Sequence, residues 1–179
     1  MKYESIADIY SANEKIRGRF NEIVGPITPE EAAALPDGEK WSIQKIVEHV
    51  SMVESGASRI CSRLVGSAKA EGKASDGSFS LGPTFGEKAA QIAALKVEAP
   101  EMVQPTGEVA ILDALARLTS ATEAIKGLRG DLESFDLSSH TFPHPFFGPL
   151  TAGEWLVIAG LHEQRHTSQI EGVLAKIRA

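Results

Sequence analysis

One stretch of the sequence, TAGEWLVIAGLHEQRHTSQIEGVLAKI at residues 151–177, indicates most directly how the chain folds. Thr151 and the Glu154 three positions later form a capping box, which marks the start of a helix. At about 100° per residue, the apolar side chains that follow return to one face. The stretch therefore predicts an amphipathic helix that continues to about residue 178. Its inward face is expected to contain Trp155, Ile158, Ala159, His162, His166, Gln169, Ile170, Val173 and Ile177.

Three further segments have the same helical spacing of apolar residues, and none shows the alternation typical of a strand. These helices are expected at residues 3–23, from Ser42 to about Val65, and from Glu108 to Leu128. Four long amphipathic helices without a convincing strand predict an all-α fold. We expect a four-helix bundle with a long crossover connection, in a single domain that spans residues 1–179.

Shorter elements are predicted between the long helices. Thr28 with Glu31 and Thr84 with Glu87 form two more capping boxes, so a helical turn and a short helix over EKAAQIAALK are expected to follow them. In the third long helix, the apolar face is expected to include Leu112. Two segments rich in Gly, Ser or Pro predict loops, at residues 66–86 and 131–150.

The composition is that of a folded globular domain, since 42% of the 179 residues are hydrophobic and 23% are charged. The net charge is -6 and the basic residues are scattered, which argues against nucleic-acid binding. The apolar run WLVIAGL is far shorter than the roughly 20 residues needed to cross a bilayer, so no membrane span is expected. The single cysteine, Cys61, excludes an internal disulfide and is expected to be a buried, unreactive thiol. Because the N-terminus lacks a secretory signal, we expect a cytoplasmic protein.

The residues HEQRH match H-E-x-x-H, the pattern of zinc proteases. The i, i+4 spacing of His162 and His166 places both imidazoles on adjacent turns of one face, where they can chelate one ion. A protease needs a third ligand downstream, but the extended pattern requires Gly and His where this chain has Gln169 and Gly172. The remaining downstream acid, Glu171, lies about 140° around the helix from His166, so it is expected to point away from the site. The sequence therefore favours a metal site and argues against a metalloprotease.

His49 is the candidate for a third ligand. It lies at the border of the apolar stripe of the helix that begins near Ser42, so it could face His162 and His166 across the bundle. Three histidines with an open coordination position are typical of catalytic zinc. The alternative is that such inward histidines are core residues hydrogen-bonded to backbone carbonyls.

Two windows of the sequence, WSIQKIVEHV near residue 41 and HPFFGPLTAGEWLVIAGLHEQRHTSQI near the C-terminus, resemble the DinB-like superfamily, also called the DinB/YfiT group. The resemblance covers the whole chain in helix order. It implies that His49, His162 and His166 hold a divalent metal ion. It also implies a four-helix bundle with a long connection between the second and third helices, and frequently a homodimer. Members of this family include S-transferases that use small thiols such as bacillithiol or mycothiol, and a thiol-dependent maleylpyruvate isomerase.

We therefore expect a metal-dependent enzyme, a transferase that joins a low-molecular-weight thiol to a small electrophile, with Zn or Ni as the metal. The alternatives are a metal-dependent hydrolase and a non-catalytic metal-binding protein. Glu163 would be the base of a hydrolase, but its offset of about 60° from the histidine face favours an exposed position or a flanking salt bridge. No catalytic residue is assigned. His140 and His144 are expected to be solvated loop residues rather than substrate contacts, and Trp41 and Trp155 to be core aromatics.

Overall fold

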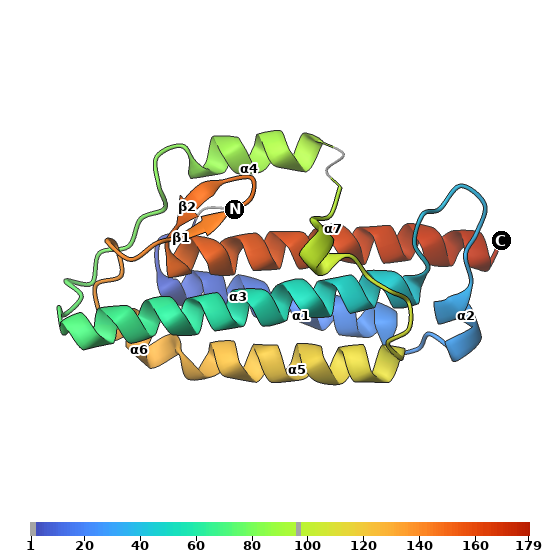
Figure 1. The fold of residues 1–179 in the computed structure, drawn as a ribbon, viewed down its shortest axis with the longest axis horizontal. Coiled ribbons are helices and arrows are strands. Elements are labelled where there is room, and N and C mark those ends of the chain that lie inside the picture. Colours follow the sequence, from blue (N-terminus) through green and yellow to red (C-terminus); the bar gives the residue numbers. More distant parts are fainter. Residues whose placement is uncertain (1–2, 96–97) are drawn as a thin grey trace.

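Four long helices dominate the computed structural model, which describes residues 3–95 and 98–179. They lie side by side with nearly parallel axes, so the predicted four-helix bundle is confirmed (Figure 1). The long helices are α1 (Ile6–Val24), α3 (Ile43–Glu71), α5 (Ile111–Gly127) and α7 (Ala152–Ile177). The smaller elements are α2 (Pro29–Ala33), α4 (Phe85–Ala94), the 3-10 helix η1 (Glu101–Val103), α6 (Arg129–Ser134), and the strands β1 (Phe142–His144) and β2 (Gly148–Leu150).

Side chains fix two of the three helix starts for which a capping box was predicted. The boxes at Thr28 and Thr151 both form, which starts α2 and α7. The box at Thr84 does not form, because the backbone of Thr84 has φ -102° and ψ 2° instead of the extended conformation of a capping residue. As a result α4 begins at Phe85, ahead of the predicted start, and its predicted end at residue 96 lies outside the described residues.

α3 continues to Glu71, past the predicted end at Val65. Val65 and Ala68 are both buried, so the packed face of the helix extends through the exposed Gly66 that suggested a loop. Gly72 ends the helix with a φ of 74°, in the left-handed region that glycine adopts without a steric penalty.

Residues 131–150, predicted as a loop, contain ordered structure. The antiparallel pair of β1 and β2 places His144 opposite Gly148, which has a φ of 79°. A backbone bridge joins Ala74 to Phe135. The predicted absence of strands was therefore wrong for these six residues, because their pairing depends on a short turn and on packing against α7.

Two buried clusters form the core, where α3 packs against α5 and α7, and α1 packs against α7. Leu112 was predicted on the apolar face of α5, but this was wrong, because Leu112 is 74% exposed. The buried face of α5 passes through Ala114 and Leu118, and Leu112 lies about 200° around the axis from Ala114. None of the helices that the structure describes is long and apolar enough to cross a membrane. The largest buried side chains of the two clusters include Ile9 and Leu156 in one, and Phe20, Ile43, Ile46, Leu118 and Ile170 in the other.

The segment between α3 and α5 is the predicted long crossover, and its described residues lie against α3 and α7 (Figure 1). Arg165 of α7 donates a hydrogen bond to the carbonyl of Leu95 at 3.2 Å. Closer to α5, side chains of α3 bind the backbone of residues 103–109. The crossover therefore bridges the two helices that carry the candidate histidines.

Candidate metal centre

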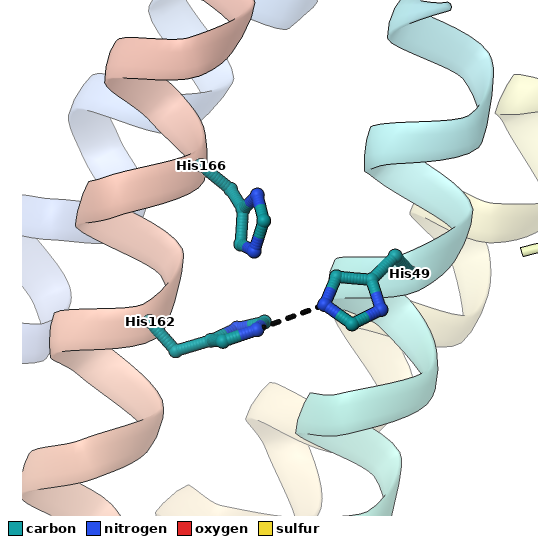
Figure 2. A group of neighbouring side chains, drawn as sticks. All are labelled: His49, His162 and His166. Carbon is teal, nitrogen blue, oxygen red and sulfur yellow. Dashed lines mark hydrogen bonds between the residues drawn. The ribbon is translucent and has the colours of Figure 1, made fainter. Parts of the chain in front are cut away.

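Three histidines from distant parts of the chain meet between α3 and α7 (Figure 2). His49 projects from α3, while His162 and His166 project from successive turns of α7. Nε2 of His49 lies 3.0 Å from Nε2 of His162. One ligand nitrogen from each ring lies within 4.8 Å of the other two, so this group could hold a metal ion. The structure thus brings together the three residues that the sequence singled out.

Hydrogen bonds at the far side of two rings determine which nitrogen faces the centre. Nδ1 of His49 lies 2.7 Å from the carbonyl oxygen of Val103, which can only accept, so Nδ1 carries the proton. Nδ1 of His166 lies 2.8 Å from Oε1 of Gln169, with the same consequence. In both residues Nε2 is left with a lone pair, the form in which an imidazole binds a metal.

His162 is held differently. Its Nδ1 is buried and has no hydrogen-bond partner among the described residues. Its Nε2 faces that of His49, and only one proton can lie between two nitrogens 3.0 Å apart. The apolar surroundings therefore contain more ring nitrogens than protein partners can satisfy, and a shared cation is the group that would satisfy them.

Burial keeps the three imidazoles uncharged. It lowers the pKa of His166 to about 4 and also lowers that of His49, which is only 4% exposed. The pKa of His162 lies well below its ordinary value, first because of burial and then because of the neighbouring His166 and His49. At neutral pH the three rings are thus in the neutral form that ligation requires.

The donor set fits a divalent cation. Ligand nitrogens about 2.1 Å from a tetrahedral zinc lie roughly 3.4 Å apart. The observed separations range from 3.0 Å to at most 4.8 Å, so small side-chain rotations would bring all three nitrogens into that range.

Trp41 forms one wall of the centre. Its ring centroid lies 5.0 Å from that of His49 and 6.4 Å from that of His166, with the latter pair nearly parallel. The predicted core position holds only in part, because Trp41 is half-buried and packs directly on two of the histidines. Trp155 is buried as predicted, and its indole donates to the carbonyl of Phe142.

The two loop histidines lie in different places. His144 is not solvated as predicted: its ring packs 4.9 Å from that of Trp155, and burial lowers its pKa to about 4. His140 is half-buried, with 20% of its side chain exposed, and its Nε2 lies 2.8 Å from a carboxylate oxygen of Glu71. Neither belongs to the group of three that could hold a metal.

Of the two roles predicted for Glu163, the structure shows the salt bridge and not the exposed position, since the residue is only 3% exposed and pairs with Arg17. Arg17 of α1 binds both of its carboxylate oxygens at 2.6 Å and also contacts Thr122. The carboxylate therefore points toward α1 and is engaged there, away from the histidine face of α7.

A second buried carboxylate, Glu54, was missed by the sequence reasoning. Its Oε2 lies 3.8 Å from Nη2 of Arg17, and its Oε1 has no hydrogen-bond partner among the described residues. Burial, and then the charge of Glu163, raise the pKa of Glu54 to about 7. Its burial could have been predicted from the sequence, because Glu54 lies at helical spacing between Val50 and Ala57 of the apolar stripe.

A surface hollow of about 500 Å³ lies between α1 and α7, but none of the three histidines lines it. Its lining mixes apolar side chains such as Ile16 with charged ones, among them Lys15, Arg19 and Glu171. The salt bridge of Glu171 with Arg19 agrees with the prediction that this acid points away from the histidines. The convergence of donor atoms, rather than the size of a hollow, identifies the candidate centre.

Comparisons with known proteins agree with this architecture. The sequence model of the DinB superfamily matches residues 12–170. The uncharacterized protein YuaE of Bacillus subtilis (strain 168) is 25% identical over 169 residues, which covers 92% of this chain and 96% of YuaE. The crystal structure of TT2238, described as a four-helix bundle protein, matches with a TM-score of 0.59 and 21% identity, and covers 93% of this chain and 98% of that one. The last comparison concerns the fold alone.

Proposed function

This chain belongs to the DinB superfamily, and we propose that it binds one divalent metal ion through His49, His162 and His166. We further propose that it is a transferase, which joins a low-molecular-weight thiol to a small electrophilic substrate. One observation carries the proposal: three neutral imidazoles from α3 and α7 direct ligand nitrogens to one point.

Three protein ligands would leave a coordination position of the metal free for a substrate group, since no fourth ligand joins the three histidines among the described residues. When bound, a divalent cation supplies positive charge that favours the thiolate form of a nearby thiol. The residues of the chain position and shield that charge: Trp41 covers one side, and the bonds of His49 and His166 to Val103 and Gln169 fix the rings.

The nucleophilic thiol has to come from a co-substrate. Cys61 is fully buried, and burial raises the pKa of its thiol to about 12. It is therefore neither accessible nor ionised at neutral pH.

Hydrolysis has less support. In hydrolases with the H-E-x-x-H pattern, the glutamate of the pattern is the general base for the attacking water. Glu163, the acid next to His162, is held by Arg17 through two hydrogen bonds, and its carboxylate faces α1. Among the described residues, the group that could hold a metal contains the three histidines and no carboxylate.

The first experiment measures metal content in protein purified without an affinity tag. We expect about one Zn or Ni per chain, lost when His49→Ala is combined with His162→Ala. His140→Ala is the matched control, because His140 binds Glu71 at the surface and should not affect the metal. Stoichiometric metal retained by the double variant would contradict the ligand assignment.

The second experiment measures turnover of a model electrophile with several low-molecular-weight thiols, each with and without metal. We expect a rate that requires both. If no thiol gives a metal-dependent rate, the transferase proposal is refuted. The homodimer implied by the family resemblance stays a prediction, which sedimentation of the same samples tests.

A further inference from the structure

We propose that Glu48 is a positioning residue, which holds His49 in its metal-binding tautomer by fixing the crossover segment that His49 binds. The proposal rests on the metal site proposed above. Glu48 lies next to His49 on α3, yet it contacts a different part of the crossover.

The carboxylate of Glu48 is buried, with 2% of the residue exposed, and hydrogen bonds to residues 106 and 107 occupy both of its oxygens. Oε1 accepts from the backbone N–H of Thr106 at 3.1 Å and from its hydroxyl at 2.9 Å. Oε2 accepts from the N–H of Gly107 at 2.7 Å. A buried carboxylate is tolerated only with such charge-assisted bonds, so removing it would leave three donors without a partner.

The chain at this point fits α3 closely. Gly107 has a φ of 82°, and a Cβ atom there would meet Cε of Lys45 at 2.6 Å. Gln44, one turn before Glu48, donates to the carbonyls of Gly107 and Val109 at 2.9 and 3.0 Å. The turn at residues 106–107 is therefore attached to α3 by side chains of α3 itself.

This turn determines where the Val103 carbonyl lies. Val103 is only three residues before Thr106, and its carbonyl accepts the Nδ1–H of His49 at 2.7 Å. While the turn is fixed, the carbonyl keeps the proton of His49 on Nδ1, so the lone pair of Nε2 faces His162. When the turn is released, the ring can rotate and its proton can move to Nε2, which blocks ligation.

Two variants test this role. Glu48→Gln keeps the size of the side chain but replaces one acceptor oxygen by an NH₂ group, which would face an N–H donor. Thr106→Val removes the hydroxyl, which donates to Glu48 and accepts from the backbone N–H of Glu108. Lys40→Ala is the matched control, because the exposed Lys40 binds Glu98 of the same crossover by an ion pair.

The first readout is independent of metal. The tautomers of His49 and His166 are measured by nitrogen-15 NMR in the metal-free chain. In Glu48→Gln we expect His49 to lose its preference for the Nδ1–H form. His166 should keep its preference, because its partner is Gln169 on α7. A folded Glu48→Gln variant in which His49 retains the Nδ1–H tautomer would overturn the proposal. If Glu48→Gln does not fold, retention of the Nδ1–H tautomer in Thr106→Val would overturn it in the same way.

The second readout is metal affinity, from competition with a coloured chelator. We expect Glu48→Gln to weaken Zn binding at least about 10-fold, Thr106→Val to weaken it by a smaller factor, and Lys40→Ala to leave it unchanged. Unchanged affinity in Glu48→Gln would count against the proposal. If the unaltered chain binds no metal, the proposed function fails, while the tautomer of His49 still tests the role of Glu48.

Discussion

Replacing Glu54 by glutamine should make the protein more stable at alkaline pH and change little at acid pH. Glu54 is a buried carboxyl whose pKa is raised from 4.5 to about 7, mainly by burial and then by the charge of Glu163. The folded chain therefore binds this proton more tightly than the unfolded chain does. Glutamine has a similar shape but cannot ionise, so it avoids the cost of a buried charge.

The sign and size of this effect on the unfolding free energy follow from the pKa of Glu54 in the unfolded and folded chains. Because the folded pKa is the higher one, the unfolding free energy falls as pH rises between 4.5 and about 7, and the loss is complete above that window. At about 1.4 kcal/mol per tenfold change in proton affinity, the full loss is about 3 kcal/mol. Between pH 5 and pH 8, the stability of Glu54→Gln relative to the unaltered chain should therefore increase by roughly 2 to 3 kcal/mol.

The assay is urea unfolding of both chains at pH 5 and pH 8, with a chelator present to remove metal. The buried histidines act in the opposite direction, because burial lowers their pKa, but they are present in both chains and cancel in the difference. Glu14→Gln, at an exposed position of α1, is the control for loss of a carboxylate. A stability difference that is the same at both pH values would refute the reasoning, since Glu54 would then be ionised throughout and neutralised by Arg17.

Three further predictions concern packing and helix ends. Cys61 should not react with a thiol reagent at pH 8 until the protein unfolds, because it is buried and its pKa is raised to about 12; rapid labelling in native buffer would contradict this. Gly72→Ala should lower the free energy of unfolding by about 1 kcal/mol in urea, because it forces a φ of 74° on alanine. Gly66→Ala, inside α3 with open space around it, should instead raise that free energy by about 0.5 to 1 kcal/mol. Equal effects of the two substitutions would be inconsistent with the observed end of α3. Gly160→Ala should lower the melting temperature despite the better helix propensity of alanine, because its Cβ would overlap Oδ1 of Asn13, whose amide binds α7.

Local patterns determined much of the fold. The bundle and the starts of α2 and α7 follow from helical periodicity and from the boxes at Thr28 and Thr151, because these signals involve residues within one or two turns of each other. The same holds for His162 and His166, whose spacing alone places them on one face of a helix. The burial of Cys61 also followed from its place near an apolar face.

Only the tertiary structure decided which partners meet. It placed Nε2 of His49 3.0 Å from that of His162, although 113 residues separate them in the chain. It buried Glu163 against Arg17 and supplied the Val103 carbonyl that orients His49. The sequence by itself thus determined the helices and the face on which two histidines lie. The completed centre depended on how the helices and the crossover pack, because burial and hydrogen bonding between distant segments leave no periodic pattern along the chain.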